Sequence, residues 1–335
     1  MNTNGNTRKA DADFLKMLII AFSIFIVMVI LNGDFAKSAN ITSMLFQLPE
    51  LGLYSLAMMM SMLTNGIDLS VVAIGNLSAI CAARVMSIGT NGGYTGARLF
   101  FFVLLGILAA LCIGILCGLV NGLIIAYIQI PPMLATMATS LIIGGISIIN
   151  TKGHSVNGAS EQFTNLGGTT FMKVPYSMWV MIGVIAVTGV ILYCTRFGFE
   201  VKMTGSNPKA SHYTGMNVKK ILVKAYLYCG IVSSICGVII LMRTNAAKAD
   251  YAATYVMQAI LCCVLGATNP NGGTAKLGCM ILALLSLQFL SSGFNMLHLD
   301  SYFKQFTWGL LLIVVLAINY LTAAIVQKRG QHKAS

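Results

Sequence analysis

Apolar runs separated by short polar stretches form the pattern of this chain from one end to the other. A transmembrane α-helix needs about 20 predominantly apolar residues, and most of these runs approach or reach that length. The pattern therefore predicts an all-α, polytopic integral membrane protein of about ten transmembrane helices. The expected spans are residues 14–31, 44–63, 69–86, 98–115, 133–149, 176–195, 221–242, 255–267, 275–297 and 303–326.

Two of these apolar stretches have unusual lengths. Residues 255–267 are short for a crossing, so this segment is either a full span or a half-helix that leads into a polar break at residues 269–273. The stretch 98–127 is too long for one untilted crossing. We expect its inner end to emerge or bend near Gly118.

Composition agrees with a membrane protein. The 335 residues are 57 % hydrophobic and only 9 % charged, whereas soluble domains carry about 25 % charged residues. We expect one transmembrane domain at residues 14–326, polar tails at 1–13 and 327–335, and no soluble domain. The net charge of +12 then reflects Lys and Arg that set orientation and meet anionic headgroups, rather than a nucleic-acid partner.

The distribution of positive charge predicts the orientation in the membrane. With the N-terminus inside, the expected cytoplasmic segments hold 13 Lys and Arg and the outer segments hold 8, and cytoplasmic loops are the ones enriched in these residues. Both termini are therefore expected in the cytoplasm. The two tryptophans, Trp179 and Trp308, are expected in the outer interfacial belt.

The densest polar segment covers residues 196–224, between the sixth and seventh spans. It holds six Lys and Arg, opposed only by Glu200. A basic segment of this kind in an apolar chain indicates a cytoplasmic loop, which we place at residues 196–220.

This loop contains signals for a short helix. Asn207 followed by Pro208 is typical of a helix N-terminus, and Gly215 is typical of a helix end. They predict a helix of barely two turns at residues 209–214. A short helix between two spans has a shape that can dock into a partner.

Residues 64–70 form a polar break between two apolar runs. Asp68 either caps a helix that starts at Leu69 or faces a pathway as a gate or ligand contact, and the two roles are compatible. Asn76, two turns further on, extends the same polar face.

Glu50 lies inside the second expected span, directly after Pro49. A carboxylate in a membrane span is costly unless it is paired, hydrated or protonated. Glu50 is therefore either a tolerated side chain of this kind or a functional group.

Small residues recur every four positions in the fourth span: Gly106, Ala110, Gly114, Gly118 and Gly122. This spacing puts them on one helix face, the pattern of close helix contact in membranes. The face either packs within the subunit or lines a pathway or subunit contact.

Glycine-rich polar breaks occur in both halves of the chain, at residues 118–122 and 269–273. Paired breaks of this kind surround the substrate sites of many transporters. They therefore give a weak indication of a pathway between the halves.

Several motifs are absent from the sequence. There is no phosphate-binding loop, no nucleophile–base or paired-carboxylate cluster, and no Cys or His spacing typical of a metal site among nine cysteines and four histidines. We expect no cofactor, no metal and no enzymatic activity in this chain.

The chain resembles the permease subunits of bacterial ABC importers of the ribose type. The resemblance covers about residues 45–320, and its most specific part is 205–218. It implies an all-α ABC importer permease fold in the bacterial cytoplasmic membrane. The similar segments are 66–71, 118–122 with 132–136, 205–210 with 214–218, and 266–269 with 272–273.

This resemblance implies partners. In the family, the short helix of a coupling loop sits in a groove of a separate ATPase, and two permease subunits form the pathway. An extracytoplasmic binding protein delivers a sugar, and ATP binding and hydrolysis switch the access of the pathway. The second permease subunit would make either a homodimer or a heterodimer. The implied ATPase-coupling residues are Gly205, Asn207, Pro208, Ala210 and Gly215.

The chain departs from the family pattern near positions expected to face the pathway. Val72 replaces a glycine, and residues 255–261 contain no carboxylate where the family has two. These differences leave the transported sugar open, and they fit a subunit that pairs with a second, different permease.

The expected function is ATP-driven translocation of a monosaccharide or related small polar solute. The alternative is a self-contained secondary transporter or channel that uses Glu50 or Asp68. The candidate substrate-pathway residues are Asn65, Asp68, Ser70, Asn76, Asn121, Gln258, Asn269 and Asn271.

Overall fold

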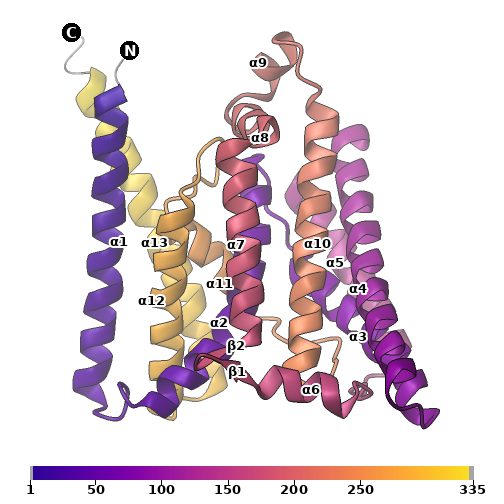
Figure 1. Cartoon of the computed structure of the whole chain (residues 1–335). Coiled ribbons are helices and arrows are strands. Elements are labelled where there is room, and N and C mark those ends of the chain that lie inside the picture. The colour runs from indigo at the N-terminus through magenta and orange to yellow at the C-terminus, as the bar shows by residue number, and fades with distance from the viewer. Residues whose placement is uncertain (1–2, 332–335) are drawn as a thin grey trace.

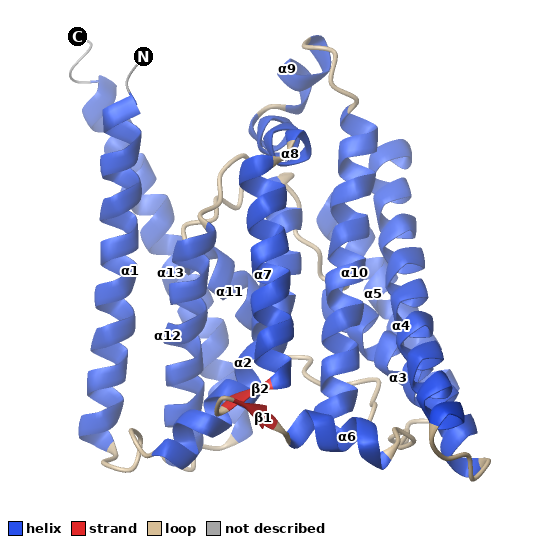
Figure 2. Cartoon of the chain, viewed as in Figure 1, coloured by secondary structure: helices blue, strands red, loops and turns tan. Residues whose placement is uncertain are grey.

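The computed structural model describes the backbone of residues 3–331 and the side chains of residues 13–318. Helices dominate this part of the chain (Figures 1 and 2). The elements are α1 (Thr3–Leu31), α2 (Ser38–Leu63), α3 (Val71–Asn91), α4 (Ala97–Leu123), the π-helix η1 (Ile124–Ile128), α5 (Pro132–Thr151), α6 (Glu161–Gly168), β1 (Thr170–Phe171), β2 (Val174–Pro175), α7 (Tyr176–Cys194), α8 (Arg196–Ser206), α9 (Pro208–Tyr213), α10 (Val218–Thr244), α11 (Tyr255–Leu265), α12 (Leu277–Met296) and α13 (Ser301–Gln331).

Within the described residues, eight helical segments are long and apolar enough to cross a membrane. Large apolar side chains such as Phe22, Phe100 and Leu141 are exposed on them, as lipid contact requires. The expected all-α polytopic fold is therefore confirmed. The eight segments belong to α1, α3, α4 with η1, α5, α7, α10, α12 and α13.

The expected count of ten depends on two further helices, α2 and α11. Helix α2 is the centre of the bundle, because every residue from Leu48 to Leu63 is buried among α7, α10, α11 and α12. A helix without a lipid-facing surface can carry polar residues, and α2 contains both Pro49 and Glu50.

Helix α11 corresponds to the half-helix of the two alternatives. Its 11 residues extend only about 17 Å, whereas the hydrocarbon core is about 30 Å thick. The non-helical segment 266–276 follows it and leads to α12. The rest of this crossing is therefore made without a helix.

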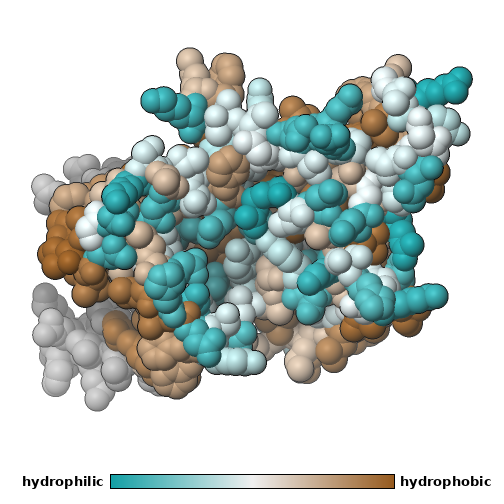
Figure 3. Space-filling view, turned by 90° about the horizontal axis from the view of Figure 1, so that it is seen from below, coloured by the Kyte–Doolittle hydropathy of each residue, from teal (hydrophilic) through white to brown (hydrophobic). Residues whose placement is uncertain are grey.

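The two ends of the molecule differ. The start of α1, the end of α13 and the α8–α9 segment lie at one end, and α6 with the β1–β2 hairpin lies at the other (Figure 1). Figure 3 views the α6 end, where hydrophilic residues gather across the surface and hydrophobic residues lie toward the rim. The α6 end of the bundle is therefore polar, with its apolar surface at the rim.

Helix α4 is not interrupted at Gly118, and whether its inner end emerges or bends near this residue stays a prediction. The helix continues to Leu123 and then widens into η1. The residues 118–122 are not a break, because their glycines serve helix packing: a Cβ on Gly118 would stand 2.6 Å from Tyr226 O, and one on Gly114 would collide with Gly230 O of α10. All five small residues of the stripe are buried, so the stripe packs within the subunit.

The two tryptophans occupy different environments. Trp179 is exposed near the start of α7, as an interfacial residue would be. Trp308 is only 4 % exposed, and its ring packs against Phe294 with centroids 5.8 Å apart. Trp308 is therefore turned toward α12 instead of lying exposed like Trp179, and its place in an interfacial belt stays a prediction.

Candidate coupling and pathway sites

The predicted short helix of the basic loop is present as α9. Asn207 Oδ1 accepts a hydrogen bond from Ala210 N at 3.0 Å, and Pro208 occupies the first turn. Gly215, with φ +82°, follows the end of the helix, in the left-handed conformation that favours glycine. Local capping residues therefore fix both ends of α9.

Helix α9 stands clear of the bundle (Figure 1). Ser211 is its only buried residue, and Tyr213 is 89 % exposed. The next segment, residues 215–219, lines an open cleft of about 450 Å³ beside His212. This end of the molecule therefore presents a protruding helix next to a hollow.

Helix α8 was not predicted, since the sequence interpretation treated residues 196–206 as part of a loop. The signals were local but weak: Thr195 Oγ1 accepts from Gly198 N at 3.2 Å as an N-cap, and Arg196 Nε donates to Glu200 Oε1 at 2.7 Å. An i,i+4 ion pair and a threonine cap are typical of a helix start.

The end of α8 lies against two distant chain segments. Gly205 packs directly on the Leu63 carbonyl at the end of α2, and a Cβ on Gly205 would collide with that oxygen and stand 2.7 Å from Gly273 N. Gly273 N donates to Leu63 O at 3.1 Å. Leu63, Gly205 and Gly273 therefore form a main-chain junction between α2, α8 and segment 266–276.

Three predicted pathway residues lie around this junction. Asn65 adopts φ +62°, and its backbone N would stand 2.8 Å from a Cβ on Gly272. Asn269 Oδ1 accepts from Asn271 N at 3.1 Å, which closes the turn before the two glycines. Asn65, Asn269 and Asn271 thus lie near the end that carries α8 and α9.

A second contact joins α8 to the bundle. Lys202 Nζ donates to Leu192 O at 2.8 Å and lies 4.5 Å from the centre of the Tyr193 ring. Partial burial lowers the pKa of Lys202. Tyr193 OH in turn accepts from Leu277 N, the first residue of α12, at 3.2 Å, so α8 contacts α12 through Tyr193.

A buried polar cluster joins the 64–70 segment to α4. Asp68 Oδ1 accepts from Ser70 N at 3.0 Å and from Ser70 Oγ at 2.6 Å, and Asn121 Nδ2 donates to Ser70 Oγ at 2.8 Å. Helix α3 begins at Val71 with no side-chain cap. The cap interpretation is therefore wrong in detail: Asp68 closes a turn ahead of α3.

This cluster leaves polar atoms unsatisfied. Among the described residues, Asp68 Oδ2 and Asn121 Oδ1 are buried without a hydrogen-bond partner, and so is Tyr226 OH. Buried polar atoms without partners are costly. Asp68, Ser70 and Asn121 are the predicted pathway residues that the structure brings into direct side-chain contact.

The remaining two predicted pathway residues lie apart from this cluster. Asn76 Nδ2 donates to Ala249 O at 3.0 Å and Tyr251 O at 2.9 Å, so it holds the α10–α11 connection against α3. Gln258 is buried near the start of α11.

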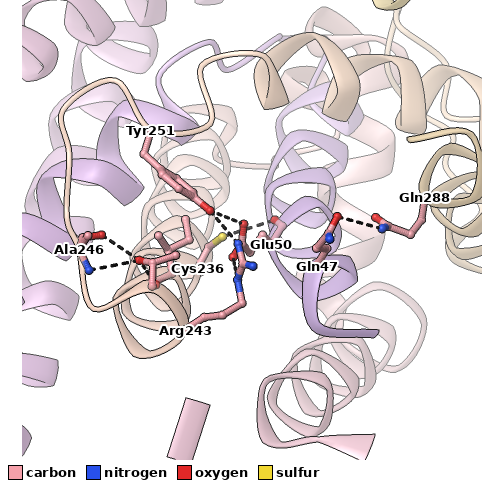
Figure 4. Close-up of polar contacts among 9 residues, drawn as sticks. Gln47, Glu50, Cys236, Arg243, Ala246, Tyr251 and Gln288 are labelled. Atoms are coloured by element: carbon pink, nitrogen blue, oxygen red, sulfur yellow. Dashed lines mark hydrogen bonds and ion pairs between the residues drawn. The ribbon is translucent and has the colours of Figure 1, made fainter. Parts of the chain in front are cut away.

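Glu50 is part of a buried ion pair that the sequence did not reveal. Its Oε1 accepts from Arg243 Nε of α10 at 2.6 Å, and its Oε2 accepts from Tyr251 OH at 3.2 Å. Arg243 Nη2 also donates to Tyr251 OH at 2.8 Å, which closes the triad (Figure 4). Glu50 is fully buried. Because the three residues come from α2, α10 and the loop after α10, the triad joins these elements.

The described residues contain no group of three or more His, Cys, Asp or Glu that could hold a metal ion. The arrangement offers a protruding helix, a main-chain junction and two buried polar clusters.

Comparison with known proteins gives a consistent picture. Residues 40–316 match the family model described as branched-chain amino acid transport system / permease component. The ribose import permease protein RbsC of Escherichia coli strain K12 is 28 % identical over 320 residues, covering 94 % of each chain. That of Haemophilus influenzae is 30 % identical, covering 90 % of this chain and 92 % of the relative. The L-arabinose ABC transporter permease protein AraH of Azospirillum brasilense is 26 % identical, covering 95 % and 89 %.

Proposed function

Because the chain belongs to the family of branched-chain amino acid transport system permease components, we propose that it is the membrane subunit of an ATP-binding cassette importer for a monosaccharide or related small polar solute. The chain is a multi-pass membrane permease and not itself an enzyme. The sugar class is carried over from the ribose and arabinose permeases to which the chain is similar.

The observation that carries the proposal is the exposed, capped helix α9, which follows α8 at this end of the molecule. A separate ATPase would bind α9, and its movement would reach the bundle through the junction of Leu63, Gly205 and Gly273. In this proposal the coupling residues Gly205, Asn207, Pro208, Ala210 and Gly215 either shape α9 or form the junction.

The proposal also assigns the two ends of the molecule. The α8–α9 end and both termini face the cytoplasm, and the α6 end receives an extracytoplasmic solute-binding protein. A second permease subunit, identical or different, completes the pathway. Polar residues at the breaks and helix ends, including Asp68, Ser70 and Asn121, would face or gate it.

The alternative is a self-contained secondary transporter that uses Glu50 or Asp68. Glu50 is engaged by Arg243 and Tyr251, which makes it a poor carrier of a coupled proton. Asp68 retains one unpartnered oxygen among the described residues and stays the candidate of this alternative.

Docking is tested by co-purification of the tagged full-length chain in mild detergent. Ala210 is exposed on α9, and Ala210→Arg should abolish co-purification of a stoichiometric ATPase by adding a bulky charge to the docking surface. The matched control is Gln162→Arg on the exposed surface of α6, at the opposite end, which should retain the ATPase. Isolation of a chain that carries solute into liposomes without ATP or a partner would overturn the proposal.

The junction is tested separately by uptake. Gly205→Val places side-chain atoms on the Leu63 carbonyl and should reduce sugar uptake at least tenfold while the ATPase still binds. Gly183→Val on α7 is the control, since a Cβ at Gly183 meets no atom within 4 Å. Equal uptake by the two variants would contradict the coupling role of the junction.

A further inference from the structure

A mixed polar and aromatic cleft of about 300 Å³ opens between the start of α11 and the first turns of α13. Its volume lies at the lower end of the range for small-molecule sites. Its lining residues are uncharged, which favours a neutral ligand. They are Ala253, Thr254, Met257, Gln305 and Trp308.

Two polar side chains that line the cleft form no hydrogen bond within the described part of the chain. Within the side chains described, 13–318, neither the Gln305 amide nor the Thr254 hydroxyl forms a hydrogen bond, although Gln305 belongs to a helix apolar enough to span the membrane. Polar groups in such a helix are costly unless water or a ligand satisfies them. Helix α11 also begins without a side-chain cap. Tyr255 N donates to Ala252 O, and the next two N–H groups of its first turn are further donors.

Trp308 supplies a rigid apolar wall. It is 4 % exposed and packs against Phe294, yet it also lines the cleft. A sugar ring has an apolar C–H face and a rim of hydroxyl groups. An indole ring beside an amide and a hydroxyl matches both surfaces, because aromatic rings bury apolar area and amides both donate and accept hydrogen bonds.

We propose that this cleft is a sugar-binding subsite of the permease, in which Trp308 contacts the sugar ring while Gln305 and Thr254 bond its hydroxyl groups. The subsite lies on α11, whose far end continues into segment 266–276 and the junction with Leu63 and Gly205. A sugar bound in the cleft would therefore contact the start of α11, and a movement of α8 would reach its end. The proposal rests on the proposed sugar import and names where this chain holds its substrate.

The test uses Trp308 as its own reporter. The chain has two tryptophans, so Trp179→Phe leaves Trp308 as the single emitter in the purified full-length protein. Ribose, arabinose, galactose and fructose are titrated to about 50 mM, well above the millimolar range that corresponds to weak binding. Leucine is titrated as a non-carbohydrate solute. A saturable change in Trp308 emission is expected with at least one sugar and none with leucine.

Variants then assign the binding to the cleft. In the Trp179→Phe background, Gln305→Leu and Thr254→Val should each raise the Kd for the sugar about tenfold, by removing hydrogen bonds. Both side chains are outside the core, so the fold should persist, which circular dichroism checks. Gln162→Leu, on exposed α6, is the matched control and should leave the Kd unchanged.

The proposal is overturned if no sugar changes the emission saturably, if leucine does so instead, or if Gln305→Leu and the control have the same Kd. Binding is measured without ATPase or uptake. A chain that binds sugar but captures no ATPase would refute the proposed importer, whereas capture of the ATPase without sugar binding would refute only the subsite.

Discussion

Ser70 holds the buried cluster of Asp68, Ser70 and Asn121 together, because its hydroxyl donates to the carboxylate and accepts from the amide. Without this hydroxyl, two fully enclosed polar groups lose a partner. Buried polar groups left unsatisfied cost more than the net gain of a typical hydrogen bond.

We therefore expect Ser70→Ala to destabilise the protein by about 1–3 kcal/mol, measured as a lower apparent Tm in detergent. Ser78→Ala is the matched control, since Ser78 Oγ is equally buried but has no partner within the described residues. It should leave the Tm unchanged or raise it. A similar loss for both serines would contradict the importance of the cluster.

The ion pair of Glu50 and Arg243 predicts a non-additive pair of mutations. Glu50→Leu or Arg243→Met alone should lower stability by about 3–5 kcal/mol, because each leaves a poorly solvated charge without its partner. The double variant should be markedly more stable than the sum predicts, because no uncompensated charge is left. Thermal denaturation of the four proteins measures this coupling, and simple additivity would show that the pair is not coupled.

At the residue scale, the sequence predicted what neighbours in the chain determine. Asn207, Pro208 and Gly215 define α9 because capping acts over three or four residues. The partner of Glu50 could not be predicted, since Arg243 is 193 positions away and only the packing of α10 against α2 brings them together.

Helices α4 and α10 are held by a contact that only small residues permit. Gly114 and Gly230 pack main chain on main chain, and so do Gly118 and the Tyr226 carbonyl. Close backbone approach increases van der Waals contact, which stabilises helix pairs in membranes.

We expect Gly114→Val to reduce folded, monodisperse protein strongly, because its side chain would collide with the Gly230 carbonyl and overpacking costs about 1–3 kcal/mol or more. Size-exclusion chromatography of the detergent-solubilised variant measures the effect. Gly145→Val on α5 is the control, since a Cβ there meets no atom within 4 Å. Normal elution of Gly114→Val would argue against close packing at this position.

The hydrophobic pattern predicted the long membrane helices, but it did not predict helix α8 or the continuity of α4 through residues 118–122. The same glycines that suggested a break at residues 118–122 serve packing inside a continuous helix, and a sequence shows the same letters in both cases. Helix α8 was hidden because its charges made it similar to a loop. The half-helix α11 was identified by its length alone, because 11 residues cannot span the hydrocarbon core.

At the scale of the whole molecule, the α8–α9 end and both termini should face the cytoplasm. A fluorescent protein fused to the C-terminus should be fluorescent, since it matures in the cytoplasm. An epitope inserted after Gly153, in the exposed turn between α5 and α6, should bind antibody on spheroplasts without permeabilisation. The opposite labelling pattern would invert the molecule and remove α9 from reach of a cytoplasmic ATPase.

The architecture predicted from the sequence was a polytopic bundle, and the structure and the family comparison confirm it. The relation between distant segments was not predictable. Asn65, Gly205 and Gly273 were singled out for separate reasons, and only the folded chain shows that they meet. The role of the candidate pathway residues stays a prediction, because in the proposed importer it would depend on how two subunits face each other.

The joint between α2, α8 and segment 266–276 has a mechanical consequence. Within the described residues, one hydrogen bond, from Gly273 N to Leu63 O, holds it, and it contributes about 0.5–1.5 kcal/mol, far less than the sum of the many backbone hydrogen bonds within each helix. If α8 is displaced, we therefore expect this joint to separate before a helix bends. In the proposed importer, small displacements of α8 would then be passed on to segment 266–276, whereas larger ones would separate this segment from α2 and α8 and leave the helices undistorted.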